Sequence, residues 1–250
     1  GLSAVLCLVY IKIKYPILAL KKEDWRIDLP FAWRHLRIGI PMALQFSVTA
    51  VGVMVMQTAL NALGSTVVAS YTAASKVEQI ITMPAMTFGM AMAVYCGQNM
   101  GAERYDRIKS GVRSCTILSC AVSIVCSVVT VLFGGQMTRL FLDQANEEVL
   151  SYAVQYLNLI AIFFIPLHLI FIYRNALQGM GHGFMPMMAG VFEFVARTVV
   201  AFTLPHALGY LGICIANPAA WIAAAVPLLI TYVVIIRRYC AATVLPGEEK

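Results

Sequence analysis

The sequence predicts an all-α membrane protein, a bundle of six transmembrane helices preceded by the end of another helix. Of the 250 residues, 60% are hydrophobic and 12% are charged, about half of the roughly 25% charged residues found in soluble domains. The apolar residues lie in long blocks, and about 20 apolar residues in a helix cross the hydrocarbon core of a bilayer. Basic residues gather in alternate connections between those blocks. These observations exclude soluble, fibrous, disordered and disulfide-stapled folds.

Residues 1–13 predict the end of a truncated transmembrane helix. The chain begins with Gly1 rather than Met, and the apolar run from Leu2 to Ile13 is too short for a complete span. Lys12 and Lys14 follow this run, whereas a signal peptide carries its basic residues before the apolar stretch. We therefore expect the chain to belong to a longer parent protein.

Residues 14–37 predict a cytoplasmic linker that contains an interfacial helix. Asp28 stands just before Pro30, an order typical of a helix start. Trp25 and Trp33 suit the boundary between membrane and water. A surface helix between two halves of a larger protein is therefore expected here.

Residues 38–238 predict a six-helix transmembrane lobe, and residues 239–250 a cytoplasmic tail. Helices are expected because every backbone polar group in lipid must be paired internally, and the alternating pattern of barrel strands is absent. Prolines interrupt five of the six blocks, so kinked helices are expected. The six blocks cover residues 38–63, 67–96, 115–133, 149–177, 185–204 and 213–236.

Charge predicts the orientation of the lobe. One side of the alternating connections carries almost all the basic residues, which the positive-inside rule assigns to the cytoplasm. Only Arg139, beside Glu147 and Glu148, falls on the other side. A multi-pass protein of the bacterial inner membrane with a cytoplasmic C-terminus follows. The cytoplasmic set is Lys12, Lys14, Lys21, Lys22, Arg26, Arg34, Arg37, Arg104, Arg107, Lys109, Arg113, Arg174, Arg237 and Arg238.

The net charge of +6 is thus interpreted as a signal of topology. Nucleic-acid binding is not expected, because no module of interleaved aromatic and basic residues is present. The seven cysteines have no metal-binding spacing, and the sequence has no CxxC or HExxH motif. Residues 179–183, GMGHG, predict a tight turn rather than a phosphate loop. We therefore expect no metal, no cofactor and no catalytic residues.

Ionisable residues inside a membrane are costly, so each is a candidate for function or for an internal pair. Lys76 and Glu78 lie near the middle of their span. They predict either a substrate cavity shared with Gln45, Gln57 and Gln79, or a buried pair that neutralises itself.

Glu193 and Arg197 stand four residues apart, which favours an ion pair within one helix. Such a pair is interpreted as structural, with a role in ion coupling as the alternative. His168 is interpreted as a hydrogen-bonded packing residue rather than a proton carrier.

Three segments together resemble the multidrug and toxic compound extrusion (MATE) transporters. They are NALGSTVVASYTAASKVEQ at residues 61–79, GQNMGA at 97–102 and RNALQGMG at 174–181. The resemblance implies a twelve-helix transporter of two lobes, of which this chain is the C-terminal six-helix lobe. The N-terminal lobe is then a missing partner.

The resemblance also implies an activity: multidrug efflux of small, often cationic amphipathic compounds by antiport with Na⁺ or H⁺ through alternating access. Some members carry acidic residues in the seventh and tenth helices, where this chain has Ser47 and Leu167. Coupling is therefore expected in the missing half, unless Glu78 or Glu193 performs it. A lipid-linked saccharide flippase of the same superfamily and an integral membrane enzyme are the alternatives.

Overall fold

The computed structural model describes residues 2–15, 28–142 and 147–244, and the chain divides into two units, residues 1–37 and 38–250. The first unit contains α1 (Leu2–Lys14) and the first turns of α2 (Leu29–Asn61). The Asp28 side chain caps α2 by accepting a hydrogen bond from the Phe31 N–H at 3.2 Å. Residues 29–37, which the sequence assigned to the linker, thus begin this long helix. Residues 16–27, with Trp25, lie outside the described ranges.

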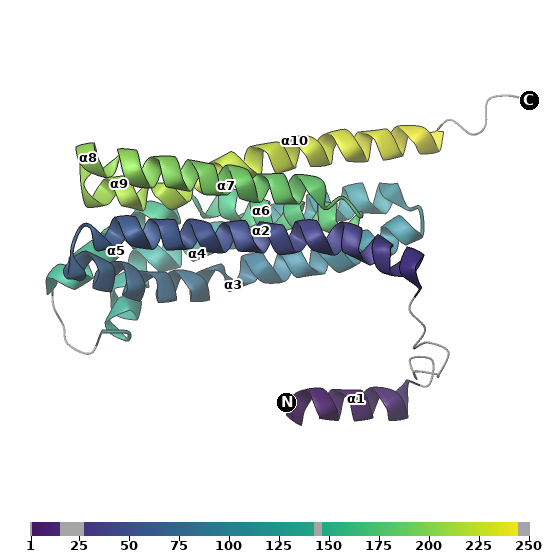
Figure 1. The fold of residues 1–250 in the computed structure, drawn as a ribbon, viewed down its shortest axis with the longest axis horizontal. Coiled ribbons are helices and arrows are strands. Elements are labelled where there is room, and N and C mark those ends of the chain that lie inside the picture. Colours follow the sequence, from purple (N-terminus) through teal and green to yellow (C-terminus); the bar gives the residue numbers. More distant parts are fainter. Residues whose placement is uncertain (1, 16–27, 143–146, 245–250) are drawn as a thin grey trace, which may run out of the picture. The chain divides into compact units, whose positions relative to one another are not determined.

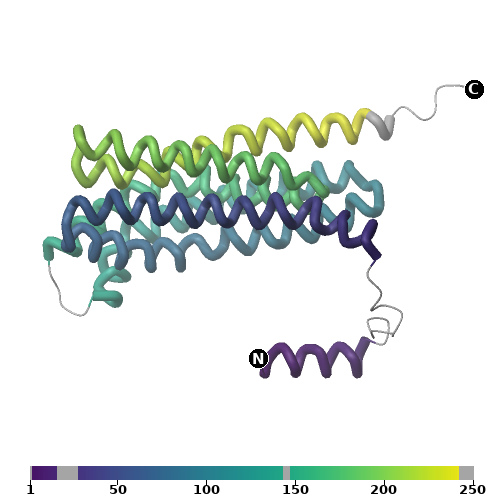
Figure 2. The backbone as a smooth tube through the Cα atoms, in the orientation of Figure 1, coloured from purple at the N-terminus to yellow at the C-terminus, as the bar shows by residue number. Residues whose placement is uncertain are grey.

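The second unit is a bundle of long helices that run nearly parallel or antiparallel to one another (Figure 1). Figure 2 shows the same path as a tube, with the first and last spans of the unit on its surface. Its helices, after α2, are α3 (Ser65–Gly101), α4 (Tyr105–Arg139), α5 (Glu147–Ala161), α6 (Phe164–Gly179), α7 (Phe184–Thr203), α8 (Pro205–Leu208), α9 (Tyr210–Cys214) and α10 (Ala216–Val244).

Among the described residues, five spans are long and apolar enough to cross a membrane, and a sixth forms if α5 and α6, which meet at 57°, are one bent span. The predicted six-helix fold is therefore confirmed. The last predicted segment, residues 239–250, begins within α10, and residues 245–250 lie outside the described part.

Three of the described spans are broken, and a proline follows each break within three residues. Pro166, Pro205 and Pro218 follow the breaks between α5 and α6, α7 and α8, and α9 and α10. A proline has no N–H to donate, so it favours a helix start over a helix interior. The Ser127 hydroxyl donates a 2.6 Å hydrogen bond to the Ala161 carbonyl at the first break. This bond pairs an oxygen that would otherwise face hydrocarbon.

Close contact between α3 and α6 forms the centre of the bundle. A Cβ added at Gly179 of α6 would overlap the carbonyl group of Ala93 in α3. In a membrane the hydrophobic effect does not drive helices together, so association depends on close packing, which small residues such as glycine allow.

The GMGHG segment that follows α6 is a turn, as predicted. Gly181 has a φ of 84°, and the His182 N–H bonds the Leu177 carbonyl at 2.9 Å. The segment thus reverses the chain between α6 and α7 within four residues.

Candidate functional site

A cavity of about 480 Å³ lies among α2, α3, α7 and α10. Four of the five predicted cavity residues line it: Gln57, Lys76, Glu78 and Gln79. Its full lining is Val53, Met56, Gln57, Tyr71, Thr72, Ser75, Lys76, Glu78, Gln79, Thr82, Arg197, Asn217 and Trp221.

The fifth predicted residue, Gln45, does not line this cavity. It is 2% exposed, and its Oε1 accepts a 3.1 Å hydrogen bond from Nε2 of Gln178. Gly190 of α7 packs so closely that an added Cβ would lie 3.0 Å from the Gln45 Cγ. Gln45 therefore joins α2 to α6 and α7, about 18 Å along α2 from Gln57 at 1.5 Å per residue.

Lys76 and Glu78 do not pair with each other within the described residues. Residues two apart on a helix do not face each other. The Lys76 Nζ lies 5.7 Å from the centre of the Phe141 ring, and Glu78 accepts a 2.8 Å hydrogen bond from the Tyr156 hydroxyl. These two residues therefore do not form the buried ion pair that was the alternative expectation.

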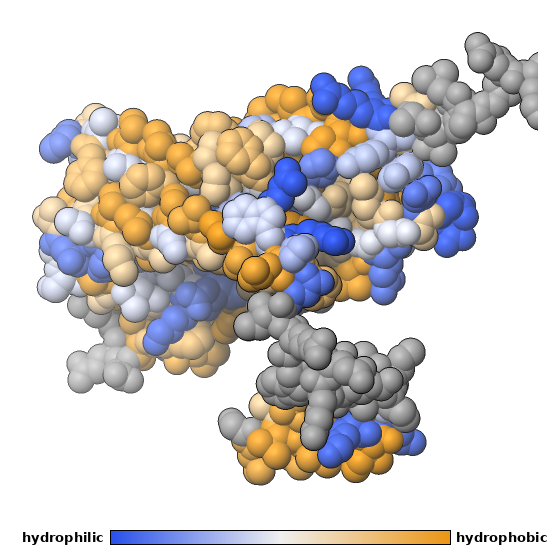
Figure 3. Space-filling model, turned by 45° about the vertical axis from the view of Figure 1, so that its right-hand side comes forward, coloured by the Kyte–Doolittle hydropathy of each residue, from blue (hydrophilic) through white to orange (hydrophobic). Residues whose placement is uncertain are grey.

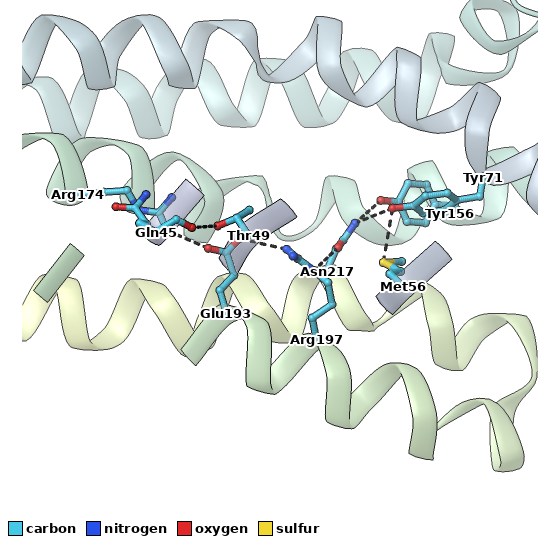
Figure 4. A network of polar contacts seen from close by, with 9 residues as sticks. All are labelled: Gln45, Thr49, Met56, Tyr71, Tyr156, Arg174, Glu193, Arg197 and Asn217. Atoms are coloured by element: carbon cyan, nitrogen blue, oxygen red, sulfur yellow. Dashed lines mark hydrogen bonds and ion pairs between the residues drawn. The ribbon is translucent and has the colours of Figure 1, made fainter. Parts of the chain in front are cut away.

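A chain of hydrogen bonds leads from Glu78 across the bundle. The Asn217 Nδ2 donates to the hydroxyls of Tyr156, at 2.7 Å, and Tyr71, at 3.3 Å. The two tyrosine rings meet edge to face with their centres 5.0 Å apart. The Arg197 Nε then donates to the Asn217 Oδ1 at 3.1 Å. Figure 4 shows Asn217 between the tyrosine pair and Arg197.

Glu193 holds two arginines at the other end of this chain. Nη2 of Arg197 lies 3.1 Å from its Oε1, and Nη2 of Arg174 lies 2.9 Å from its Oε2. The side chains of Glu193 and Arg197 are 8% and 5% exposed. The ion pair expected four residues apart is present, with Arg174 of α6 added to it (Figure 4).

The four charged side chains that these bonds connect are electrically balanced only while Glu78 is ionised. Glu78 and Glu193 carry two negative charges, and Arg174 and Arg197 carry two positive charges. Binding one proton or one Na⁺ at Glu78 would leave a net charge of +1 in a low-dielectric region, where an uncompensated charge is costly. A single cation can therefore change the electrostatic energy of the network substantially.

Several members of this network were not singled out in the sequence. Arg174 was counted among the basic residues that set the topology, yet it is 12% exposed and bonded to Glu193. Tyr71 and Tyr156 resemble ordinary packing or interfacial tyrosines, and only the structure reveals their partners. Asn217 offered a usable signal, because it is a polar residue at the start of an apolar block and precedes a proline.

His168 lies outside the cavity lining. It is fully buried, and its Nδ1 lies 2.8 Å from the Ser119 hydroxyl, which agrees with a packing role. Across the part of the chain that the structure describes, no three His, Cys, Asp or Glu side chains gather as a metal site would require.

Comparison with known proteins gives consistent results. Residues 41–203 match the MatE family. The "Probable multidrug resistance protein YoeA" of Bacillus subtilis is 27% identical over 204 residues, which are 79% of this chain and 42% of that protein. The "Probable multidrug resistance protein NorM" of Thermotoga maritima is 24% identical over 202 residues, 77% of this chain and 43% of that protein. The chain thus spans about two fifths of the length of these relatives.

Solved structures share the fold. One is described as the outward-facing conformation of a multidrug resistance MATE family transporter of the MOP superfamily. It matches with a TM-score of 0.85 and 16% identity, over 96% of this chain and 55% of that one. A MOP superfamily transporter from Pyrococcus furiosus matches with a TM-score of 0.80 and 16% identity, over 94% of this chain and 55% of that one.

Proposed function

The chain belongs to the MatE family, and from this premise we propose that it forms one lobe of a transporter that exports drugs and other xenobiotics by antiport against Na⁺ or H⁺. The names of the curated relatives support the substrate class. Family membership also argues against the alternative of a membrane enzyme. The other wall of the pathway is the missing N-terminal lobe.

The cavity on α2, α3, α7 and α10 is the observation that carries this proposal. Ligand sites are concave and mostly apolar, with a few polar groups that fix orientation. Val53, Met56 and Trp221 supply apolar and aromatic surface here, and Glu78 supplies an anion. Lys76 and Arg197 also line the cavity, and Arg197 is paired with Glu193. Because an indole face and a carboxylate both attract organic cations, we propose a bulky amphipath whose cationic group lies beside Trp221 and Glu78.

Glu78 is our candidate for the coupling residue of this lobe. Ser47 and Leu167 offer no carboxylate at the positions where some family members carry acids; Ser47 donates to the Ala43 carbonyl, and Leu167 is buried. Glu193 is already bonded to two arginines. Glu78 forms no ion pair among the described residues, so its charge is the one available to a proton or Na⁺.

Binding at Glu78 would act on two other elements. Tyr156 and Asn217 connect Glu78 to Arg197 in α7, and Asn217 lies in the first turn of α10, just after the break that follows α9. A cation bound at Glu78 makes this carboxylate a weaker acceptor for the Tyr156 hydroxyl. It also leaves the four charged side chains of the network with a net positive charge. The bundle would then favour a different packing of α7 and α10, which is how a bound ion shifts a two-state equilibrium.

The experiment is efflux of a fluorescent cationic dye from a drug-sensitive bacterium that expresses the full-length protein containing this chain. We expect efflux that accelerates with an inward Na⁺ or H⁺ gradient. Glu78→Gln keeps the shape of the side chain but cannot change charge, so it should abolish the dependence on the ion. Glu147 is an exposed acid at the start of α5, so Glu147→Gln is the matched control and should leave that dependence intact.

Two negative results would mean different things. A wild-type protein without ion-dependent efflux would refute the transport proposal. A Glu78→Gln variant with the same ion dependence as wild type would leave transport standing and remove Glu78 as the coupling residue.

A further inference from the structure

A second groove, of about 400 Å³, lies between the first half of α4, the last turns of α10 and α6. It shares no lining residue with the cavity proposed for substrate. Its lining residues are Lys109, Val112, Arg113, Thr116, Ile117, Tyr173, Tyr232, Val233, Ile236 and Arg237.

The mouth of this groove is positively charged. Lys109 and Arg113 stand one turn apart on α4, and Arg237 faces them from α10. All three are exposed, and none forms an ion pair within the described ranges. The nearby acid Asp106 is held by Arg104 at 2.9 Å, so it does not neutralise the three cations. Figure 3 shows hydrophilic surface at the end of the bundle where α10 ends.

Hydroxyl groups line the groove below the charges. Thr116 donates to the Tyr173 hydroxyl at 3.4 Å. Tyr232 is 6% exposed, and its buried hydroxyl has no hydrogen-bond partner among the described residues. An unpaired buried donor is costly, so a ligand that offers it an acceptor is favoured. At 1.5 Å per residue, Tyr232 lies about 7.5 Å before Arg237 along α10, toward the start of the helix.

Apolar surface surrounds the groove. Ile117 is 62% exposed on α4, and Val234 is 44% exposed on α10. In a membrane protein such surface contacts acyl chains, so the groove opens where lipid is present. The groups of the groove match those of a phospholipid in order. The three cations correspond to the phosphate, the Tyr232 hydroxyl to an ester carbonyl, and the apolar surface around them to the acyl chains.

We propose that this groove is a binding site for the headgroup of an anionic phospholipid. The phosphate lies among Lys109, Arg113 and Arg237, and an ester carbonyl accepts a hydrogen bond from the Tyr232 hydroxyl. Basic pockets between transmembrane helices are suited to anionic headgroups. A free phosphate would satisfy the cations but would leave the Tyr232 donor unpaired. The site is separate from the substrate cavity and does not depend on the transport proposal.

The test uses the full-length protein, purified in neutral detergent and titrated with phosphatidylglycerol, phosphatidylcholine or inorganic phosphate, with bound ligand counted by native mass spectrometry. The variant Arg113→Gln/Arg237→Gln removes two of the three charges at the mouth. Its matched control, Arg107→Gln/Arg238→Gln, removes two charges from the same end of the bundle that do not line the groove, and it keeps the Arg104–Asp106 pair.

We expect phosphatidylglycerol to bind more tightly than phosphatidylcholine. Each basic residue near an anionic lipid contributes about a fivefold factor in affinity, so the groove variant should weaken binding roughly 25-fold. The control should weaken it much less. Tyr232→Phe, which keeps the ring and removes only the hydroxyl, should weaken phosphatidylglycerol binding severalfold and leave phosphate binding unchanged.

Equal losses in the two double variants would overturn the proposal, because they would indicate diffuse surface attraction. Equal affinity for the two lipids would also overturn it. Displacement of the lipid by an equal concentration of inorganic phosphate, with no effect of Tyr232→Phe, would assign the groove to a soluble anion instead.

Discussion

Replacing Tyr156 by phenylalanine tests the polar network with the loss of one oxygen atom. The change deletes the donor to Glu78 at 2.8 Å and the acceptor of Asn217 at 2.7 Å. The ring stays, and so does its contact with Tyr71. Any effect therefore reports hydrogen bonding rather than packing.

Two scales bound the size of this effect. A hydrogen bond to a charged group contributes about 1.5–3 kcal/mol in water-soluble proteins, whereas side-chain bonds between membrane helices average about 0.6 kcal/mol with a maximum near 1.7. Because the acceptor is the Glu78 carboxylate, we expect the free-energy contribution of this bond to lie at the upper end of the range for membrane helices. Asn217 keeps Tyr71 as a weaker acceptor at 3.3 Å, which limits its own loss. We expect a destabilisation of about 1.5 kcal/mol.

The assay is denaturant unfolding in mixed micelles, with Tyr152→Phe as the control. Tyr152 lies one turn away on the same helix, packs edge to face on Tyr210, and has no hydrogen bond from its hydroxyl to a described residue. Its substitution should change the free energy of unfolding by less than about 0.5 kcal/mol. Equal effects of the two substitutions would refute the assignment of a working hydrogen bond to Tyr156.

Two further substitutions test burial and close packing. Arg197→Gln breaks a buried ion pair and should cost about 3 kcal/mol or more, while Arg139→Gln removes an exposed pair at 3.6 Å and should cost less than about 1 kcal/mol; similar unfolding midpoints would contradict the buried network. Gly179→Ala should cost about 1–3 kcal/mol through overpacking against Ala93. Gly101→Ala, which meets open space, should be neutral in the same measurement.

The sequence predicts the six-span architecture well because hydrophobic length and charge alternation are properties of single segments. Prolines account for the helix breaks only in part, because Pro41, Pro84 and Pro227 lie inside the continuous helices α2, α3 and α10. The sequence also places Gln57, Lys76, Glu78 and Gln79 around one cavity, since their two helices are consecutive in the chain.

Partners from distant helices could not be predicted in this way. Gln45 has the same residue type as Gln57, but its depth along α2 brings it to Gln178 instead of the cavity. Arg174 lies close enough to a helix end to resemble a topology charge, and its burial depends on the packing of α7. Tyr156 acquires its role only because α3 and α10 meet beside it. These contacts depend on how each helix is rotated about its axis and on which helices lie beside it. Neither property can be predicted from the sequence of one segment.

The short turn between α6 and α7 has a consequence for membrane insertion. It joins two consecutive spans by four residues, and the Arg174–Glu193 pair links those same spans. The two helices can therefore enter the bilayer as one hairpin, with opposite charges already paired and most of the insertion penalty offset. Glu78 lies in α3, which is synthesised before the helices that carry its partners. Tyr156 follows in α5, and Arg197 and Asn217 follow in the last two spans. The final step of biogenesis thus completes the surroundings of the acid that lines the cavity.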